Sequence, residues 1–310
     1  MRRSKLSLLL LLGIFCIGLL TLTACSSKNY VENVYEIDEK FNDISIKTDT
    51  ADILFLPSED GTLKVACHEH VRKKHFVEVQ NGVLIINAVD NRKWYDYIEI
   101  NIGSPKITVY LPELEYSSLV IEESTGDIEI SNNFKFKSID VSLSTGDVKC
   151  YASATETIKI EASTGDVTLE SISASALDIS VSTGDVTVSH ITCGGEITVG
   201  VSTGKTYFTD TMCKNLISTG STGDILLKNV ISTEKIYIKR STGDVTLEGS
   251  DAAELFITTS TGDVKGSLLT DKVFIAKTDT GRISVPKSTT GGRCEITTDT
   301  GDIKISILNG

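Results

Sequence analysis

Apolar side chains recur at fixed distances from a series of Thr-Gly pairs along most of the chain. They lie five and seven residues before each glycine and two and four residues after it, as Ile160, Ile158, Val167 and Leu169 do around Gly165. Alternation of apolar and polar residues on both sides of the glycine is typical of strands with one buried face. Because the alternation changes parity at the glycine, each repeat is predicted to be two short strands joined by a corner.

The Thr-Gly pairs stay in phase over ten repeats, with 19 or 20 residues between successive glycines. The glycines are Gly126, Gly146, Gly165, Gly184, Gly204, Gly223, Gly243, Gly262, Gly281 and Gly301. Residues 48–53 are a degenerate eleventh copy with Ala51 in the glycine position, whereas Thr219-Gly220 and Thr290-Gly291 fall out of phase. Such short strands cannot bury an apolar face alone, so the repeats must stack around a shared core. The sequence predicts an all-β fold, a right-handed parallel β-solenoid with rungs of 19 to 20 residues.

These repeats resemble a family of bacterial putative adhesins, a domain of unknown function with Ser-Thr-Gly-Asp motifs on a right-handed β-helix. The resemblance extends from Asp43 to Ile305 and includes a strand from Ile107 to Pro112 that ends in Leu-Pro. It implies the fold and an exported protein. It implies little about activity, because one fold supports many functions.

The first residues have the pattern of a bacterial export signal. Three cations within the first five residues precede an apolar run from Leu6 to Leu22, which is followed by Thr23, Ala24 and Cys25. The sequence around Cys25 resembles a lipobox, which implies lipidation of Cys25 and cleavage before it. The alternative is an uncleaved membrane helix, since about 20 apolar residues span a bilayer. Both interpretations place the rest of the chain on the extracytoplasmic face of the cell membrane.

Four segments are expected in chain order. Residues 1–24 are a lipoprotein signal peptide, 25–35 a tether, 36–115 an N-terminal β segment with the degenerate first rung and a cap, and 116–310 the repeat solenoid. The short tether is expected to hold the rod near the membrane. The partner expected there is an unknown envelope protein, such as an envelope-stress sensor, or a glycan.

Charge excludes one class of partner. Removal of residues 1–24 leaves 27 Lys and Arg against 42 Asp and Glu, a net charge of −15. Nucleic acids and anionic lipid head groups would be repelled by such a surface. Cations and neutral or basic partners remain.

An acidic residue follows eight of the ten glycines, and stacking is expected to place these residues in one outward column. They are Asp127, Asp147, Asp166, Asp185, Asp224, Asp244, Asp263 and Asp302. Neighbouring carboxylates about 4.8 Å apart would repel by about 0.9 kcal/mol in water. Hydrogen bonds from turn amides could offset this repulsion, and so could Ca²⁺ bound between carboxylates. The nine-residue pattern of known calcium-binding repeats is absent, so the amide explanation is preferred and no cofactor is expected.

Two other clusters lie outside the regular repeats. His68, His70 and His75 could bind zinc, but the apolar alternation that ends at Cys67 leaves His68 and His70 on the solvent face, so no metal site is expected. The aromatic cluster Trp94, Tyr95 and Tyr97 could recognise a sugar or a partner protein, or could cover one end of the solenoid.

A regular repeat favours a non-enzymatic binding or scaffold module, because catalysis needs unlike groups that converge at one place. No catalytic residues are therefore assigned. The alternative is a carbohydrate-active β-helix enzyme that uses Lys205, Lys239, Arg240 and Arg282, although these cations are scattered along the rod.

Five thiols remain after cleavage and lipidation, so they cannot all pair internally. Cys193 and Cys213 each lie nine residues after their glycine. Stacking would hold their Cα atoms about 4.8 Å apart, which is within the range for a disulfide. Either a disulfide or a stacked pair of free thiols is expected, while Cys150 and Cys294 fall in inward columns.

Overall fold

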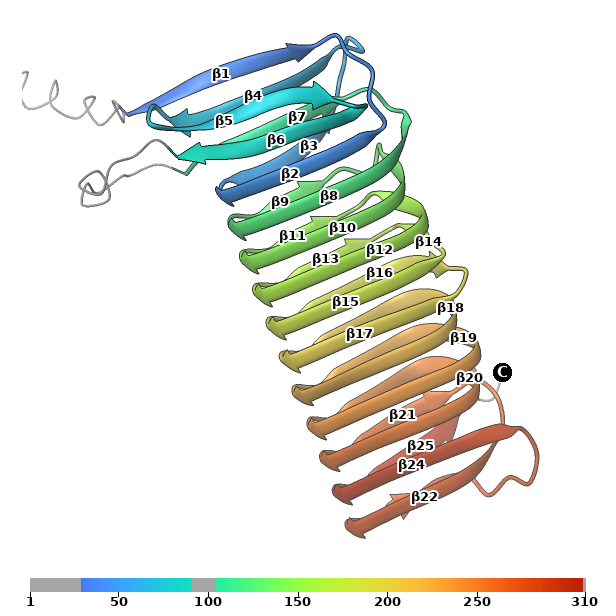
Figure 1. Cartoon of the computed structure of the whole chain (residues 1–310). Coiled ribbons are helices and arrows are strands. Elements are labelled where there is room, and N and C mark those ends of the chain that lie inside the picture. The colour runs from blue at the N-terminus through green and yellow to red at the C-terminus, as the bar shows by residue number, and fades with distance from the viewer. Residues whose placement is uncertain (1–28, 91–103, 309–310) are drawn as a thin grey trace, which may run out of the picture.

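The computed structural model describes residues 29–90 and 104–308. Every regular element in these ranges is a strand, and the strands form a long stack of parallel rungs (Figure 1). The prediction of an all-β parallel solenoid is confirmed. The degenerate copy around Ala51 is the first of eleven strand-corner-strand rungs among the described residues.

In chain order the strands are β1 (Tyr30–Ile37), β2 (Asp43–Thr50), β3 (Asp52–Pro57), β4 (Leu63–His70), β5 (Lys73–Gln80), β6 (Val83–Asp90), β7 (Lys106–Leu111), β8 (Glu115–Thr125), β9 (Ile128–Ile130), β10 (Lys135–Thr145), β11 (Val148–Cys150), β12 (Ser153–Thr164), β13 (Val167–Glu170), β14 (Ser173–Ala174), β15 (Ala176–Thr183), β16 (Val186–Cys193), β17 (Glu196–Thr203), β18 (Thr206–Thr222), β19 (Ile225–Thr242), β20 (Val245–Thr261), β21 (Val264–Leu268), β22 (Lys272–Thr280), β23 (Ile283–Ser284), β24 (Gly292–Thr300) and β25 (Ile303–Ile307).

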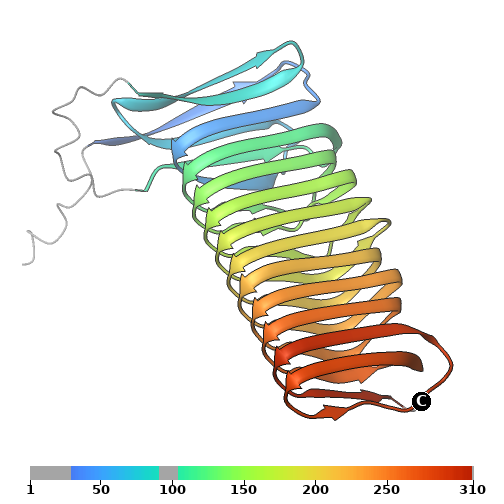
Figure 2. The same ribbon diagram turned by 60° about the horizontal axis from the view of Figure 1, so that its bottom comes forward.

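The rungs build two parallel sheets that face each other across the core (Figure 2). Strands that end at a Thr-Gly corner form sheet one, which includes β2, β8, β10, β12, β15 and β17. Strands that begin after a corner form sheet two, which includes β3, β9, β11, β13 and β16. The long strands β18, β19 and β20 bend, so that their first halves belong to sheet two and their second halves to sheet one.

The predicted core columns are confirmed. In the rung of Gly165, Ile158 and Ile160 before the corner and Val167 and Leu169 after it are fully buried. A fifth inward position, three residues before each glycine, was not predicted. It holds small or apolar residues in the middle rungs, but it is Glu123 near one end and Arg240 towards the other, and both of these side chains are buried.

Close stacking of the corners explains the glycines. Gly165 has φ +135°, which L side chains rarely adopt. A Cβ atom on Gly165 would lie 1.8 Å from the carbonyl oxygen of Gly146 in the preceding rung. The Gly165 amide donates a hydrogen bond of 3.0 Å to the Thr183 carbonyl of the following rung. The other corner glycines from Gly126 to Gly301 have the same geometry.

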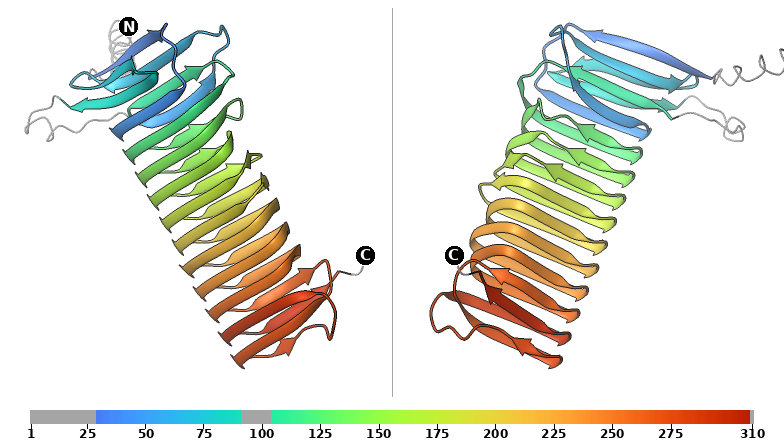
Figure 3. Two further views of the ribbon diagram at one scale, coloured as in Figure 1. Left: turned by 45° about the vertical axis from the view of Figure 1, so that its right-hand side comes forward. Right: turned by 180° about the vertical axis from the view of Figure 1, so that it is seen from behind.

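The N-terminal end of the stack is covered by antiparallel strands (Figure 3). β5 pairs antiparallel with β6, which extends sheet one past β2, while β1, β4 and β7 extend sheet two past β3. β1 begins at Tyr30, so the expected tether boundary at residue 35 lies too far along the chain. The Leu-Pro strand is present as β7.

The two C-terminal rungs are stacked in reverse order, which differs from the expected succession of each repeat on the last. β24 lies between β20 and β22 in sheet one, and β25 lies between β21 and β23 in sheet two (Figure 1). β22 and β23 therefore form the end of the rod. Because no rung lies beyond them among the described residues, the inward side chain of Ile283 is 46% exposed.

The corner geometry predicts unequal effects for two glycine substitutions. Gly165→Ala should lower the free energy of unfolding by at least about 2 kcal/mol, because its Cβ atom would collide with the Gly146 carbonyl at an unfavourable φ. Gly194→Ala, where no atom lies within 4 Å of the added Cβ, should change it by no more than about 0.5 kcal/mol. Urea unfolding followed by circular dichroism measures both, and equal losses would contradict the stacking explanation.

Candidate functional site

The acidic column has a structural role at the corners. Asp147 Oδ1 accepts a 2.8 Å hydrogen bond from the Asp166 amide of the next rung, and the same bond joins Asp127 to the Asp147 amide at 2.9 Å. Comparable bonds connect the corner residues along the rod, except that Lys205 has no carboxylate to offer the Asp224 amide. These charge-assisted bonds offset the repulsion between neighbouring carboxylates.

A serine column runs beside the acidic column and was missed in the sequence. Eight exposed serines stand two residues before their glycines on sheet one, and they are Ser124, Ser144, Ser163, Ser182, Ser202, Ser221, Ser241 and Ser260. Asp49 occupies the equivalent position in the first rung, and Asp279 and Asp299 occupy it in the last two. Serine at this position in eight of ten repeats was the signal that could have revealed the column.

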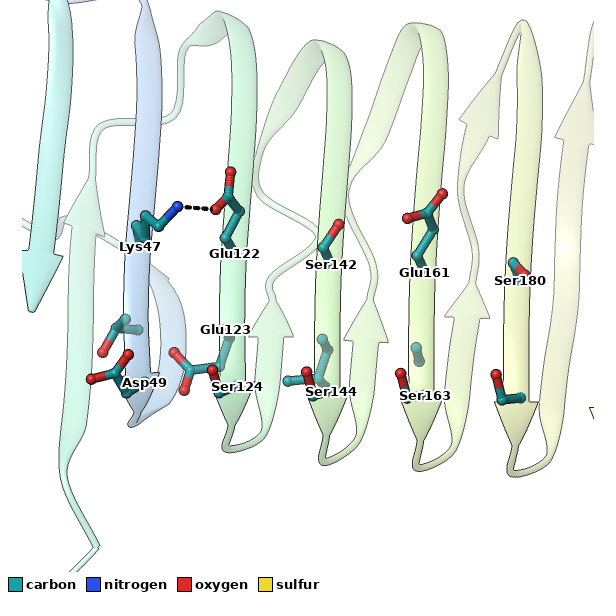
Figure 4. A pocket seen from close by; sticks show the side chains of 14 residues that line it. Lys47, Asp49, Glu122, Glu123, Ser124, Ser142, Ser144, Glu161, Ser163 and Ser180 are labelled. Atoms are coloured by element: carbon teal, nitrogen blue, oxygen red, sulfur yellow. Dashed lines mark hydrogen bonds and ion pairs between the residues drawn. The ribbon is translucent and has the colours of Figure 1, made fainter.

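A groove follows the serine column on the outer face of sheet one (Figure 4). Its volume is about 520 Å³. Its lining includes four members of the serine column on successive rungs, from Ser124 to Ser182. A second groove of about 340 Å³ adjoins it at Ser180 and Ser182 and continues as far as Ser241. Together they form the serine groove, an open channel that crosses eight successive rungs.

Carboxylates dominate the end of the serine groove nearest the N-terminal cap. Asp49, Glu122, Glu123 and Glu161 line it, and Lys47 is the cation among its lining residues. Lys47 Nζ forms an exposed ion pair of 2.6 Å with Glu122, drawn as the dashed line in Figure 4. This end of the groove therefore favours ligand groups that are cationic or that donate hydrogen bonds.

Glu123 differs from its neighbours because it is 5% exposed. Its Oε1 accepts hydrogen bonds from the Ala51 amide at 3.3 Å and the Thr125 amide at 3.1 Å, while its Oε2 has no partner among the described atoms. Burial raises the pKa of Glu123 to about 7, although the two amide bonds oppose the shift. The carboxyl group is thus poised to titrate near neutral pH.

The cations proposed for an enzyme do not converge. Lys205 Nζ lies 3.9 Å from Asp224 Oδ2. Arg282, which belongs to the terminal rung, forms an ion pair of 2.8 Å with Asp302 of the adjoining rung. Lys239 lines the serine groove towards its far end.

Arg240 points into the core, where its guanidinium donates to the hydroxyls of Thr206 at 2.8 Å and Ser218 at 3.2 Å. Burial lowers the pKa of Arg240 to about 10. The out-of-phase Gly220 makes room for this side chain, because a Cβ atom there would lie 2.0 Å from the guanidinium.

One of the two histidines expected on the solvent face does not lie there. His68 is exposed as expected, but His70 is buried beside the ring of Tyr30, its partner on the neighbouring strand β1. His75 is also buried, and its Nδ1 lies 2.8 Å from Glu69 Oε2. Glu69 is the next inward residue of β4 after Cys67.

The thiols follow the predicted columns. Cys150 and Cys294 are buried in the core. Cys193 and Cys213 follow the paired residues Thr192 and Met212 on adjacent rungs, and both thiols are free.

Two groups of predicted residues lie outside the described part of the chain. They are the lipidation site Cys25 and the aromatic cluster Trp94, Tyr95 and Tyr97. Within residues 29–90 and 104–308, no helix is long and apolar enough to cross a bilayer.

Comparison with known proteins identifies one matching family model, described as Toastrack DUF4097, which matches residues 41–205 and again residues 194–309. No curated protein matches the sequence. Among solved structures, a putative adhesin from Bacteroides fragilis is 18% identical, with 90% of this chain and 98% of that chain covered and a TM-score of 0.39. A putative lipid binding protein from Parabacteroides distasonis is 17% identical, with 89% and 97% covered and a TM-score of 0.42. At these identities and TM-scores, the similarity to the two structures gives no information about the function of this chain.

The raised pKa of Glu123 predicts a pH-dependent loss of stability. Between about pH 4.5 and 7 the unfolded chain releases the Glu123 proton while the folded chain retains it, so folding becomes less favourable as pH rises through this window. Glu123→Gln keeps an oxygen for the two amides and removes the titration. The melting temperature of Glu123→Gln minus that of the wild type should therefore increase between pH 5 and pH 8. A constant difference would contradict the shift.

Proposed function

The chain belongs to the Toastrack DUF4097 family, and from that premise we propose that it is a lipid-anchored, non-enzymatic binding module of the bacterial cell envelope. The observation that supports this function is the serine groove. It repeats the same hydroxyl from rung to rung along one sheet face, so it suits an extended ligand better than a small molecule. Repeat solenoids commonly bind partners over such long surfaces.

The lining of the groove suggests the chemistry of the ligand. Serine hydroxyls both donate and accept hydrogen bonds, and the carboxylates near the cap accept them from hydroxyl or ammonium groups. We propose an envelope glycan that carries free amino groups. The net charge of −15 for residues 25–310 would favour its approach and would repel polyanions.

The lipobox-like sequence at Cys25 supports the anchor. Cys25 precedes Tyr30, the first residue of β1, by five positions, which span at most about 18 Å when extended. A lipid on Cys25 would therefore hold the N-terminal cap close to the outer face of the membrane. This position also suits a membrane partner such as an envelope-stress sensor.

Binding to immobilised polymers tests the groove. The chain should be retained on chitosan, which carries hydroxyl and ammonium groups, and not on polygalacturonate. Ser163→Arg should weaken retention at least tenfold, because it places a bulky cation in the groove, which corresponds to about 1.4 kcal/mol. Thr168→Arg puts the same side chain on sheet two of the same rung and should change retention less than twofold. Equal effects would refute the groove as the contact surface.

The same assay separates binding from catalysis. A binding module leaves the polymer at its original length. Depolymerisation that is lost on Lys205→Ala or Lys239→Ala would instead support the carbohydrate-active enzyme.

The anchor is tested by metabolic labelling with a fatty acid. Cys25→Ser should lose the label, because the Cys25 thiol is the expected acyl acceptor. Cys16→Ser, within the signal region, should retain it. Label that persists on Cys25→Ser would refute lipidation at this site.

A further inference from the structure

A compact set of metal-ligating side chains lies in the N-terminal cap, and none of its three members lines the serine groove. Cys67 Sγ, one carboxylate oxygen of Glu69 and one ring nitrogen of His75 all lie within 4.8 Å of one another. Cys67 and Glu69 project inward from β4, and His75 projects inward from β5. The three residues are at most 4% exposed, so donors of three chemical types converge inside the cap.

Neighbouring strands fix the outer atoms of this cluster. Asn33 on β1 donates a hydrogen bond of 2.5 Å to Glu69 Oε1. Thr48 on β2 lies 3.0 Å from His75 Nε2. Glu69 Oε2 accepts a hydrogen bond of 2.6 Å from the His75 amide and lies 2.8 Å from His75 Nδ1. One ligand atom of each of these residues lies within 4.8 Å of the Cys67 thiol. Metal-binding histidines and carboxylates are typically held through their outer atoms in this way.

The Cys67 thiol differs from two other buried thiols in its contacts. Cys67 Sγ has no hydrogen bond to any residue in the described ranges, whereas Cys150 donates to the Ala152 carbonyl and Cys193 to two carbonyls. The sulfur atom of Cys67 therefore keeps its bonding capacity for a ligand that also reaches Glu69 and His75.

We propose that Cys67, Glu69 and His75 form a binding site for a divalent transition metal of the zinc type. The combination of sulfur, nitrogen and oxygen donors suits zinc, whereas calcium and magnesium prefer oxygen alone. Binding breaks the S–H bond of Cys67 and releases that proton to solvent, while the proton between His75 Nδ1 and Glu69 Oε2 moves to His75 Nε2, beside the Thr48 hydroxyl. Three bonds to the metal form, and a fourth tetrahedral position is left for another ligand.

The site would join the strands that close the N-terminal end of the rod. β4 extends sheet two and β5 extends sheet one, and the paired residues His70 and Lys73 form the hairpin between them. A metal held by Cys67, Glu69 and His75 would cross-link the two sheets beside this hairpin. The proposal is independent of the serine groove and of the lipid anchor.

Cobalt titration tests the site directly. The full chain, purified in detergent and freed of metal with a chelator, is titrated with Co²⁺ and then with Zn²⁺. We expect one Co²⁺ per chain with a thiolate-to-cobalt charge-transfer band, loss of that band when Zn²⁺ replaces Co²⁺, and a higher melting temperature with Zn²⁺. Absence of the charge-transfer band from the wild-type chain would overturn the proposal without recourse to a variant.

Two cysteine variants identify the ligand. Cys67→Ser should abolish the charge-transfer band, and Cys150→Ser, which alters another buried cysteine in the core, should retain it. Circular dichroism of the metal-free Cys67→Ser chain shows whether it is folded. A band of unchanged intensity in Cys67→Ser would mean that another thiol binds cobalt and would overturn the assignment.

Discussion

The structure depends on how closely one corner can approach the next. The carbonyl oxygen of each corner glycine lies about 2 Å from the place where a Cβ atom of the adjoining corner would stand. Only glycine permits this approach, and the approach brings corner amides within hydrogen-bonding distance of threonine carbonyls and aspartate oxygens. The register of the core columns and of the serine column follows from the corners, because every other position is counted from them.

Periodicity in the sequence was sufficient to predict the repeated part of the fold. Corner glycines and the apolar columns around them, such as Ile158 and Val167, recur often enough to define strand, turn and inward face. The cap has no such repetition, so the buried positions of His70 and His75 could not be predicted, although Glu69 continues the alternation of Val65 and Cys67. The groove was missed for a different reason, since serine is mostly an exposed residue and its alignment is meaningful only once the rungs are stacked.

The polar residues of the interior occur in matched groups. Arg240 lies where Gly220 leaves space and where Thr206 and Ser218 supply hydroxyls. Glu123 on β8 is the register partner of Thr48 on β2, and the Thr48 hydroxyl in turn lies 3.0 Å from His75 Nε2. Nearby hydrogen bonds reduce the cost of burying these polar groups, although Glu123 Oε2 and Arg240 Nε and Nη1 have no partner among the described residues. An inward column of a solenoid can therefore switch from apolar to polar residues over a few rungs while the strand register stays the same.

The reversed order of the last two rungs has a consequence for how the chain is made. Synthesis proceeds from the N-terminus, so β22 and β23 emerge before β24 and β25, the strands that will separate them from the rest of the rod. Rungs can thus stack in the order of synthesis as far as β21, but not beyond it. The final fold requires residues 292–307 to insert between rungs that are made before them, so this end of the rod cannot close until those residues have been synthesised.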